Sequence, residues 1–565
     1  MERNKMPNVI LLLTDDQGYG DLGCTGNPWL KTPNLDGFYK DSVRFTDFHV
    51  SPICTPTRGA LMTGRYPVRN GAHTVGWGRQ MLWEDETTIA DVFSKNGYKT
   101  GVFGKWHLGE TYPYRPHDRG FKTAVVHQSG FVGCAYDYWG NNYFDDTYFH
   151  NGKPEKYKGY CTDIWFEEAS HFISEAKADG FPFFCYLATN APHSPYLVDP
   201  MYTKPYAGNR NIPVPEFYGM IANIDENFGK LRKMLKDTGI EDNTIIIFMT
   251  DNGSAAGCEI DKDERITKGY NAGMRGKKCS YYEGGHRVPF FIRWPAHGLL
   301  GGRDIDELAA HIDLFPTLIE LCGLEYREGV KKVDGISLAE LFKMQNACLP
   351  KRNIYVQYTY NSKTRRPEKW NVTVMHDHWR LVKGNELYDI KIDPGQLHDV
   401  SANHLDMVSE LRAAHESMWN EVSPGFESYC PVLIGNENED PLYLHSFFIG
   451  GQEQIRAGLK RHSFWTVRIE KDGDYRFHLM RWPEELGLPV NAVLADMESR
   501  SVNAVSASMI IDEKLYERSI LEGDDSISFI INLKCGETEM EAWFTDIEGE
   551  NIGAYYMYIE KLNQN

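Results

Sequence analysis

Short apolar runs alternate with amphipathic stretches over about the first 320 residues of the chain. The apolar runs are Val9–Leu13, Thr100–Phe103, Phe183–Ala188, Ile245–Met249 and Phe290–Arg293. Short runs that are apolar almost throughout are typical of strands buried on both faces of a sheet. Between them, Ile164–Ala178 and Phe217–Leu235 repeat apolar residues at helical spacing. We therefore expect an α/β fold in which helices sandwich a large, mostly parallel or mixed sheet.

A chain of 565 residues is too long for one ordinary hydrophobic core, so more than one domain is expected. After residue 330 the pattern changes to strand-like runs followed by one helical stretch. The runs are Ile354–Tyr358, Trp370–Met375 and Trp379–Val382, and the helix lies near Leu405–Trp419. This order predicts an α/β domain over residues 1–330 and a small α+β subdomain over residues 331–428.

The last part of the chain, residues 429–565, is predicted to be an additional β-rich, sandwich-like domain. Its strand-like runs are Phe464–Ile469, Tyr475–Met480, Ser526–Leu533, Met540–Phe544 and Ala554–Ile559, with turn residues between them. Residues 471–474, Lys-Asp-Gly-Asp, lie between the first two runs and are typical of a tight turn. We therefore expect the first two runs to pair as a β-hairpin.

Charge and hydropathy limit the partners of the chain. Its formal net charge is −19, which argues against nucleic acid, because polyanions need a basic surface. If the substrate is itself anionic, positive charge must be concentrated in the pocket that binds it. No apolar run reaches the roughly 18–20 residues that a membrane span needs, so no membrane span is expected.

The cysteines and the N-terminus bear on the compartment. There are 11 cysteines, scattered without C-x-x-C pairs or zinc-ligand spacing, which fits a reducing compartment. The first apolar strand follows the N-terminus directly and ends in carboxylates, so it is not a signal peptide. The sequence as it stands predicts a cytoplasmic protein. Removal of a signal peptide would instead make the protein periplasmic or secreted.

Oxygen donors follow two of the predicted strands. Asp15 and Asp16 come after the first strand, and Asp251 and Asn252 come after the fourth. In a sheet of this class, ligands bind beyond the carboxyl ends of the strands. Three carboxylates and one amide fit a hard divalent cation such as Ca²⁺, with Mg²⁺ as the alternative. Asp, Asn and Gly also form ordinary turns after strands, so either string alone would decide little.

Cys54 opens a string, C-T-P-T-R, that precedes a short helical stretch. The first N–H groups and the dipole of a helix favour an anion at that end. Arg58 lies four residues further on, one turn away on the same face. The string therefore suits the handling of an oxyanion, although a buried structural cysteine beside a surface arginine is the ordinary reading of such a pattern.

Basic side chains follow two further strands and one later loop. Lys105 and His107 come after the second apolar run, and His193 comes after the third. Lys277 and Lys278 lie in a basic cluster just before the last run. Such clusters are usually solvated, but this one would supply the local positive charge that an acidic protein needs to hold an anion.

In combination, these strings resemble the type I, formylglycine-dependent sulfatases, which are arylsulfatase-like members of the alkaline phosphatase superfamily. The matching strings are D-D-Q-G-Y-G-D, C-T-P-T-R-G-A-L-M-T-G-R-Y, G-K-W-H-L-G, A-P-H-S-P, T-D-N-G and Y-E-G-G. They follow the family's order from residue 8 to about residue 295, and weaker matches extend to about residue 420. The resemblance implies an alkaline phosphatase-like fold, a catalytic domain over residues 1–330 and a bacterial source. The segment after residue 430 resembles no family known to us.

The resemblance implies that a maturation enzyme oxidises Cys54 to formylglycine, which is hydrated to a geminal diol. One hydroxyl would attack the sulfate sulfur and release the alcohol, and the second would then be deprotonated to expel sulfate. The implied cation ligands are Asp15, Asp16, Asp251 and Asn252. The cation would polarise the sulfate and the nucleophile, and Asp251 would also accept the proton of the nucleophile.

The remaining implied roles belong to basic residues. Arg58, Lys105 and Lys278 would clamp the diol and the sulfate charge that builds during transfer. His107 would act as the base of the second step, and His193, helped by Lys278, would protonate the leaving oxygen. Of the two adjacent lysines, Lys278 is chosen because its offset from Glu283 matches the family pattern.

The expected substrate is a sulfated saccharide that loses sulfate from a terminal sugar. The segment Phe131–His150 is dense in aromatic and amide side chains that suit sugar rings and hydroxyl groups. The further candidates for sugar contacts are His127, Asp137, Arg79 and His73.

Two other functions remain open. A phosphate or phosphonate monoester hydrolase would share the fold, since function depends on the site and not on the fold. Asn252 argues against it, because phosphatases of this superfamily tend to place a His there for transition metals. The other alternative is an inactive protein that binds sulfated glycans, although each site position holds a competent residue.

Overall fold

The computed structural model describes residues 6–326, 331–344, 347–361, 363–364, 366–448, 450–461, 463–495 and 498–562. The largest sheet has ten strands in the order β13-β2-β12-β9-β1-β8-β4-β5-β6-β7. The boundary predicted at residue 330 lies in the gap 327–330, outside the described residues.

Five neighbouring strands at the centre of this sheet run parallel. They are β9 (Thr244–Thr250), β1 (Asn8–Thr14), β8 (Phe183–Ala188), β4 (Lys99–Lys105) and β5 (Thr123–His127). Because they are parallel, their carboxyl ends meet at one edge of the sheet. Four of the five apolar runs predicted to be strands form part of this centre.

On each side, the strand next to the parallel centre runs antiparallel to it. On one side lie β12 (Phe290–Arg293), β2 (Val43–Phe45) and β13 (Asp304–Ile305). On the other side lie β6 (Thr147–His150) and β7 (Lys153–Lys156). The sheet is therefore mixed, and the predicted α/β class is confirmed.

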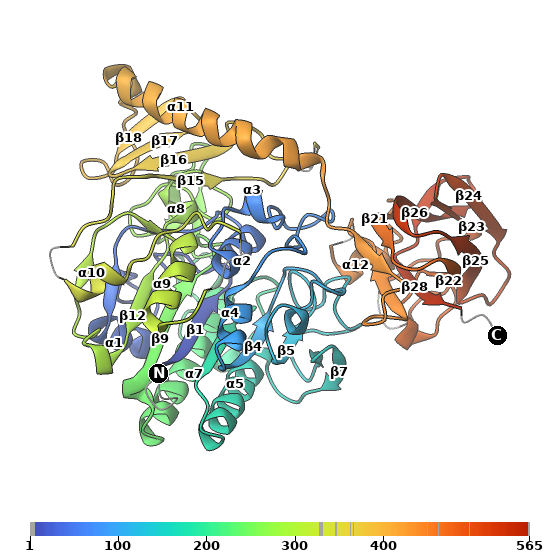
Figure 1. Cartoon of the computed structure of the whole chain (residues 1–565), viewed down its shortest axis with the longest axis horizontal. Helices are drawn as coiled ribbons and strands as arrows, with labels where there is room; N and C mark the ends of the chain where they lie inside the picture. The colour runs from blue at the N-terminus through green and yellow to red at the C-terminus, as the bar shows by residue number, and fades with distance from the viewer. Residues whose placement is uncertain are drawn as a thin grey trace.

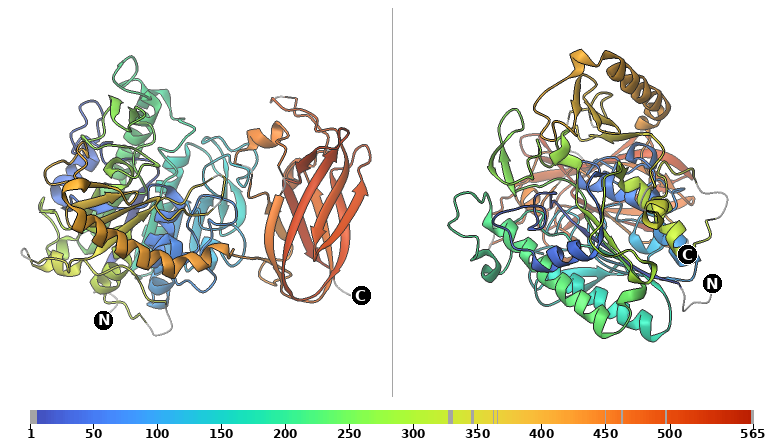
Figure 2. Two further views of the ribbon diagram at one scale, coloured as in Figure 1. Left: turned by 90° about the horizontal axis from the view of Figure 1, so that it is seen from above. Right: turned by 90° about the vertical axis from the view of Figure 1, so that its left-hand side faces the viewer.

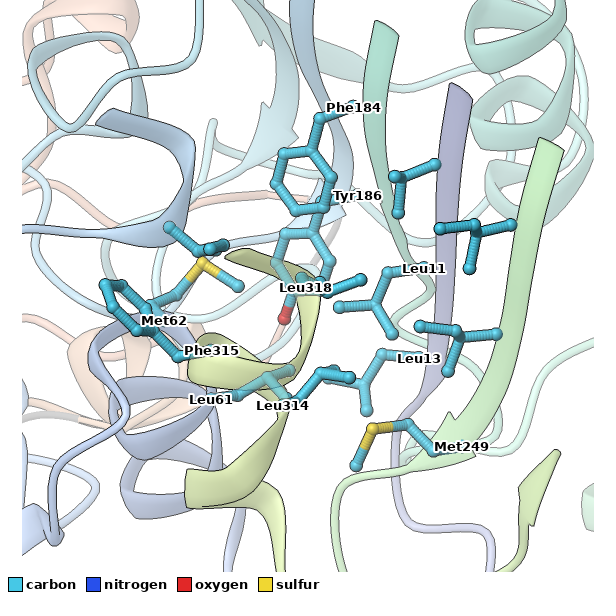
Figure 3. Close-up of a cluster of buried hydrophobic side chains, with 14 of the residues drawn as sticks. Leu11, Leu13, Leu61, Met62, Phe184, Tyr186, Met249, Leu314, Phe315 and Leu318 are labelled. Carbon is cyan, nitrogen blue, oxygen red and sulfur yellow. The ribbon is translucent and has the colours of Figure 1, made fainter. Parts of the chain in front are cut away.

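Helices cover both faces of the sheet (Figures 1 and 2). One face packs against α2 (Cys54–Thr63), α4 (Ile89–Lys95) and α9 (Leu314–Cys322), and the other against α1 (Pro33–Asp41), α5 (Cys161–Ala178) and α7 (Pro215–Asp237). Successive side chains of β1 point to opposite faces. Leu11 joins Leu61 and Phe315 in one core (Figure 3), whereas Ile10 joins Ile224 in the other. This double burial is why the predicted strands are apolar at every position.

A smaller sheet with one helix across it lies beside the large sheet (Figure 1). Its strands are β15 (Asn353–Gln357), β16 (Val372–His376), β17 (Trp379–Val382) and β18 (Glu386–Asp389), all antiparallel, and the helix is α11 (Leu405–Val422). Leu411 of α11 packs into the core under this sheet.

The C-terminal part of the chain forms two packed β-sheets (Figure 2). One contains β19 (Val432–Ile434), β21 (Ser463–Ile469), β26 (Gly536–Asp546), β23 (Ala504–Ile511), β24 (Lys514–Ser519) and β27 (Asn551–Gly553). The other contains β20 (Leu442–His445), β28 (Tyr556–Lys561), β22 (Gly473–Met480) and β25 (Ser526–Leu533). Side chains of both sheets share one hydrophobic core, so the additional β-rich sheets are present.

The predicted hairpin between β21 and β22 is wrong. β21 pairs with β19 and β26, whereas β22 pairs with β25 and β28 in the opposite sheet. The turn residues therefore carry the chain from one sheet to the other. There, Asp472 accepts a hydrogen bond from Cys535 N (2.7 Å), in the connection from β25 to β26. Both strands bury every second side chain, and that alternation does not tell which sheet a strand joins.

The cysteines form no disulfide, and each of the 11 is a free thiol. Three of them, Cys279, Cys348 and Cys535, are exposed. None of the helices in the described ranges combines the length and the apolar character that crossing a membrane requires.

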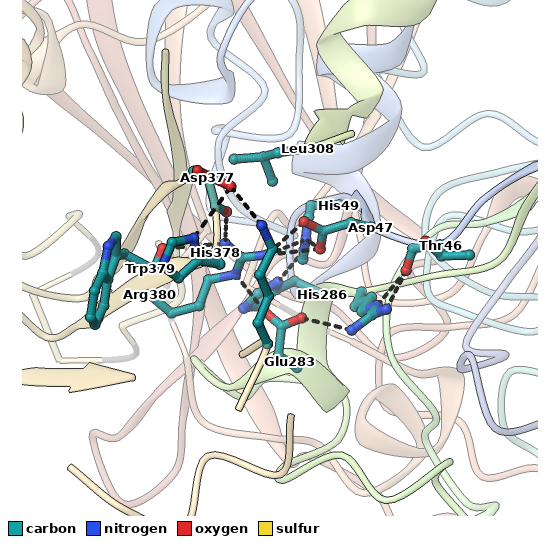
Figure 4. A network of polar contacts seen from close by, with 12 residues as sticks. Thr46, Asp47, His49, Glu283, His286, Leu308, Asp377, His378, Trp379 and Arg380 are labelled. Atoms are coloured by element: carbon teal, nitrogen blue, oxygen red, sulfur yellow. Dashed lines mark hydrogen bonds and ion pairs between the residues drawn. The ribbon is translucent and has the colours of Figure 1, made fainter. Parts of the chain in front are cut away.

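Arg380 of β17 ties the smaller sheet to the large one (Figure 4). Its side chain is fully buried. It donates to both oxygens of Asp47 (2.8 and 2.9 Å) and to Glu283 Oε1 of α8, Glu283–His286 (2.9 Å). Because both carboxylates are buried as well, each would lose its main positive partner without Arg380.

We expect Arg380→Met to lower the apparent free energy of unfolding by about 3–5 kcal/mol, because it leaves two buried carboxylates without their main partner. Urea unfolding followed by circular dichroism measures this loss. Arg366→Met is the control, because Arg366 pairs with Glu427 at the surface, and it should cost less than about 1 kcal/mol. Equal losses in the two variants would contradict this account.

Candidate active site

The carboxyl ends of the central strands bring the predicted site residues together. Asp15 follows β1, Lys105 ends β4, His193 lies shortly after β8 and Asp251 follows β9. Cys54 begins helix α2 beside them. Lys105 and Asp251 lie close enough to its thiol for their charges to shift its pKa. Residues far apart in sequence therefore form one site, because parallel strands end at a common edge.

Cys54 is the first residue of α2, and Ile53 before it makes no side-chain cap. The first N–H groups of the helix are therefore not satisfied by a capping side chain and favour negative charge nearby. The thiol is buried, with Sγ 3.5 Å from His107 Nδ1. Burial raises the pKa of Cys54, and Lys105 only partly opposes this effect. A thiol with a raised pKa is a poor nucleophile at neutral pH.

Three buried carboxylates lie beside Cys54. Asp15, Asp16 and Asp251 each offer an oxygen, and these oxygens lie within 4.8 Å of one another. Burial alone would favour the neutral acid of Asp16, but Lys278 and His193 hold its pKa well below the usual range. Burial raises the pKa of Asp251, Asp15 acts in the same direction, and Arg58 acts against it.

The donor atoms of this cluster fit a hard divalent cation. Asp15 Oδ1 and Asn252 Oδ1 are buried and have no hydrogen-bond partner. The Asn252 amide nitrogen donates to Asp16 Oδ1 (3.0 Å), which leaves the amide oxygen as the free donor. Unsatisfied buried oxygens are costly, and an oxygen-only set suits Ca²⁺ or Mg²⁺.

Each carboxylate of the cluster has a basic partner. Lys105 Nζ donates to Asp15 Oδ2 (2.5 Å), and Arg58 Nη2 donates to Asp251 Oδ2 (2.8 Å). Lys278 pairs with Asp16. The neighbouring Lys277 points away and donates to the carbonyl oxygens of residues 255 and 258. The positive charge that a −19 chain needs is thus concentrated at this edge.

The two histidines are held neutral by burial. The pKa of His107 lies well below its usual value, because burial, Lys105 and Arg58 all disfavour its protonated form. Burial lowers the pKa of His193 to about 4, although Asp16, 3.6 Å from its Nε2, opposes the shift. Phe131 stacks on the ring of His193, with the centroids 5.8 Å apart.

Asp16 and His107 adopt left-handed backbone conformations, with φ of 68° and 59°. Such conformations cost of order 1–3 kcal/mol for residues other than glycine and often occur at functional sites. Hydrogen bonds hold Asp16 in place, since its N–H donates to Asp251 Oδ1 (3.0 Å) and its carbonyl accepts from Ala255 N (3.0 Å).

A cavity of about 1040 Å³ opens above this cluster. Cys54, His107, His193 and Lys278 line it, whereas Arg58 and Lys105 lie buried beneath and do not. The reacting positions are thus accessible from the cavity, and the residues that compensate their charge are protected from water.

Two of the four residues predicted to contact sugar, His127 and Asp137, lie outside the lining of the main cavity. His127 does not line the main cavity but faces a small pocket of about 30 Å³ behind His107. Asp137 holds a loop, accepting hydrogen bonds from Gly133 N (2.9 Å) and Asn141 Nδ2 (3.0 Å). Both side chains are buried, and their role in binding sugar stays a prediction.

The other two, His73 and Arg79, lie together outside the lining of the cavity. His73 Nε2 is 3.3 Å from Arg79 Nη1, and the guanidinium lies over the ring of Tyr429, 4.1 Å from its centroid. Burial lowers the pKa of His73 to about 3. The sequence identified polar residues near the site but could not show that these are buried.

The aromatic residues of the segment 131–150 differ in burial, from the buried Tyr148 to the exposed Phe144. Trp139 contacts Trp482, and Tyr143 is fully buried. Of this segment, Phe131, Cys134 and Tyr136 line the cavity, together with Gly130, which lies just before it. The proposed sugar platform is therefore only partly formed by this loop.

Several residues that line the cavity were not predicted. Trp77, Tyr358, Tyr360, Phe447 and Arg461 come from three different parts of the chain. Trp77 and Tyr360 stack with their centroids 5.0 Å apart. No motif marks these positions, because they meet only through the packing of the separate domains.

A second buried group with metal-ligating side chains consists of His49, Glu283 and His286 (Figure 4). His49 Nδ1 lies 2.9 Å from His286 Nδ1. Arg380 and Arg287 both contact Glu283 and already compensate its charge. This group is therefore part of the polar network that joins the two sheets, and its positive neighbours disfavour a cation.

Comparison with protein families identifies two matches. The family model described as sulfatase matches residues 7–324, more than half of the chain. The model described as N-sulphoglucosamine sulphohydrolase, C-terminal, matches residues 273–421. Neither match reaches the C-terminal β-sheets.

Among curated proteins, the chain is 32% identical to N-acetylgalactosamine-6-sulfatase of Homo sapiens over 356 residues. That match covers 59% of this chain and 65% of the relative, which is slightly under two thirds of its length. The chain is also 31% identical to arylsulfatase A of Homo sapiens over 397 residues, covering 64% of this chain and 72% of the relative.

Among solved structures, Ps i-CgsB in complex with k-i-k-neocarrahexaose resembles the chain with a TM-score of 0.64 and 29% identity. The match covers 73% of this chain and 93% of the solved one.

We expect Ca²⁺ to raise the melting temperature of the protein, because a cation satisfies the oxygens that lack partners. At a hundredfold excess over its Kd, a ligand stabilises the folded state by about 2.7 kcal/mol. Differential scanning fluorimetry with Ca²⁺ or a chelator measures the shift. Asp15→Ala should abolish the shift and Asp179→Ala, at an exposed carboxylate, should keep it; a shift that survives in Asp15→Ala would refute this placement.

The pKa of His73, about 3 when folded against 6.5 for an unperturbed histidine, predicts a pH-dependent stability. The unfolded chain binds the proton more readily, so the contribution is complete above about pH 6.5 and is lost as the pH falls toward 3. At pH 5 the loss should be roughly 2 kcal/mol. Urea unfolding between pH 7 and 5 should show a shallower pH dependence for His73→Gln, and an unchanged slope would contradict the assignment.

Proposed function

The chain belongs to the sulfatase family, and from that premise we propose that it hydrolyses a sulfate ester of a sulfated saccharide. Its nucleophile is formylglycine made from Cys54, and a divalent cation, Ca²⁺ or Mg²⁺, assists it. The observation that carries the proposal is the position of Cys54 at the start of α2 and at the floor of the cavity, beside three buried carboxylates.

Formylglycine at position 54 supplies, once hydrated, one hydroxyl group to attack sulfur and a second whose deprotonation expels sulfate. The thiol encoded by the gene is a poor substitute, because burial raises its pKa. His107, 3.5 Å from Sγ, lies where a base for the second deprotonation is needed. Its lowered pKa keeps the ring unprotonated at neutral pH, which is the state that a base requires.

The cation, when bound, polarises the sulfate oxygen and the nucleophile. Asp15, Asp16, Asp251 and Asn252 would hold it. Asp251 is also suited to accept the proton of the attacking hydroxyl group, because a raised pKa makes its carboxylate a stronger base.

The leaving oxygen needs a proton from a group that faces the cavity. His193 lines the cavity and lies 3.6 Å from Asp16 Oδ2. Burial lowers its pKa to about 4. An anionic sulfate ester close to the ring would favour the protonated form, so substrate binding itself would prepare His193 to act as the acid.

The charge of the sulfate group requires fixed positive groups near it. Lys278 lines the cavity, Lys105 is buried close enough to Cys54 to lower its pKa, and Arg58 donates to the carbonyl oxygen of Lys105 (2.9 Å). Because these cations are buried, their interaction with developing negative charge is screened little by water. They are therefore suited to stabilise the transferred sulfate.

The names of the relatives support a saccharide substrate. One relative is an N-acetylgalactosamine-6-sulfatase, and the solved structure of similar fold contains a neocarrahexaose. A cavity of about 1040 Å³ is at the upper limit of pockets that hold drug-sized ligands. It is therefore larger than a simple aryl sulfate requires.

Mass spectrometry of the Cys54 peptide tests the nucleophile, and turnover of 4-nitrophenyl sulfate and N-acetylgalactosamine 6-sulfate tests the reaction. We expect formylglycine at position 54 and a loss of activity of roughly 10³-fold or more in Cys54→Ala, as for removal of other nucleophiles. Cys348→Ala, at an exposed thiol, is the control and should keep full activity.

Matched phosphate esters distinguish the main alternative. Faster cleavage of 4-nitrophenyl phosphate than of the sulfate would make the protein a phosphatase. Full activity of protein whose Cys54 is unmodified would refute the nucleophile. Binding of the sulfated sugar without turnover, in protein shown to contain formylglycine, would indicate an inactive binding protein.

A further inference from the structure

The cavity above Cys54 is not closed by the large sheet alone. Phe447, Arg461 and Phe464 form part of its wall, and all three belong to the C-terminal β-sandwich. This part of the chain lies outside both family matches. A part of the chain that neither family match covers thus forms one side of the cavity.

Gln452 of helix α12 (Gln452–Arg456) fixes the sandwich to the loop beside the cavity. Its side chain is buried, and Nε2 donates to the carbonyl oxygens of Cys134 (3.1 Å) and Asp137 (3.3 Å). Its Oε1 accepts from Gly140 N (3.0 Å). The nitrogen and the oxygen of the Gln452 amide both bind the loop backbone. The contact therefore fixes the orientation of the sandwich relative to the loop as well as the distance between them.

The loop itself enters the sandwich. Ala135 is part of the sandwich's hydrophobic core, and its N–H donates to Gly450 O (3.0 Å). Its carbonyl oxygen accepts from the hydroxyl group of Tyr556 (2.9 Å). Loop and sandwich therefore pack as one unit.

A second attachment lies away from this loop. Glu439 accepts hydrogen bonds from Tyr112 N (2.6 Å) and from Arg115 (3.2 Å), and the hydroxyl group of Tyr114 donates to Pro431 O (2.8 Å). Two separate attachments restrain rotation of the sandwich about either one. The wall that it contributes is therefore a fixed part of the cavity.

The same loop contacts the catalytic histidines. Gly130 lies so close to His107 that a Cβ atom would come within 3.0 Å of the imidazole ring. Phe131 stacks on His193. The sandwich thus supports a loop that packs against both proton-transfer groups, which places its own wall next to the reacting position.

Arg461 is the feature of this wall that points to a ligand. It is exposed. Among the described residues, its side chain makes one hydrogen bond, from Nη1 to Phe448 O (3.2 Å). A guanidinium has five N–H donors, so most of them face the cavity or solvent. Of the described residues that line the cavity, Lys278 and Arg461 are the two with lysine or arginine side chains. Lys278 pairs with Asp16 at the floor.

The surroundings of Arg461 suit a sugar ring. Phe447 and Phe464 offer apolar surface on the same wall, and Trp77 with Tyr360 forms a stacked pair on another. Glu541 also lines the cavity and is suited to bind sugar hydroxyl groups. Aromatic surfaces with a few polar groups are typical of ligand sites, and a guanidinium matches the two oxygens of a carboxylate or sulfate.

We infer that the β-sandwich forms a second sugar-binding subsite, in which Arg461 binds an anionic group on the sugar next to the one that loses its sulfate. The inference rests on the proposed function and extends it from one sulfated sugar to an oligosaccharide with at least two anionic groups. The second anion is a sulfate or a carboxylate, since both bind a guanidinium in the same way.

Isothermal titration calorimetry on the full chain with Cys54→Ala tests this subsite without turnover. The probes are an iota-carrageenan tetrasaccharide, in which the neighbouring anion is sulfate, and a chondroitin 6-sulfate tetrasaccharide, in which it is carboxylate. We expect at least one to bind, and Arg461→Ala to weaken that binding about tenfold or more, the cost of losing a charge-assisted hydrogen bond. Arg461→Lys should recover part of the loss. The probe that responds identifies the anion.

Lys460→Ala is the matched control, because Lys460 is also exposed but pairs with Asp546 outside the cavity. Its affinity for the tetrasaccharides should equal that of the parent. Equal binding by the parent and Arg461→Ala, or no binding of either tetrasaccharide, would overturn the subsite. Turnover of 4-nitrophenyl sulfate by mature protein separately reports the sulfatase function, so failure of one inference is distinguishable from failure of the other.

Discussion

The structure depends on how buried charge is compensated at the carboxyl ends of β1 and β9. Three carboxylates, Asp15, Asp16 and Asp251, lie together out of contact with water, and isolated charges in such a place would be very costly. Lys105, Lys278 and Arg58 each pair with one of them. These pairs hold the strand ends, the start of α2 and the cavity floor in one arrangement, so the residues proposed to act in catalysis also stabilise the fold.

Much of the fold could be predicted because burial leaves a strong mark on the sequence. Phe183–Ala188 and Phe290–Arg293 are strands with the predicted bounds, since a strand between two layers of helices must be apolar throughout. The site residues could be predicted for a related reason. Parallel strands end at one edge, so the polar residues that follow β1, β4, β8 and β9 meet there, and the family resemblance predicts a role for each.

The rest depends on contacts that leave no local pattern. β21 and β22 alternate buried and exposed residues as hairpin strands do, yet they pair in different sheets. His73 has the sequence context of a ligand-binding residue, but the packing around it makes it a buried, neutral group. Trp77 and Arg461 reach the same cavity only because separate domains dock, and nothing near either residue in the sequence predicts this.

The burial of α2 limits when Cys54 can be modified. All ten residues from Cys54 to Thr63 are buried, and the thiol begins a formed helix. An enzyme that binds the peptide around Cys54 in order to oxidise it could not reach that peptide in the folded chain. Oxidation would therefore have to precede the folding of this helix, and a molecule that folds first would keep its thiol permanently. The share of active molecules would then be set by a race between the modifying enzyme and folding during or soon after synthesis.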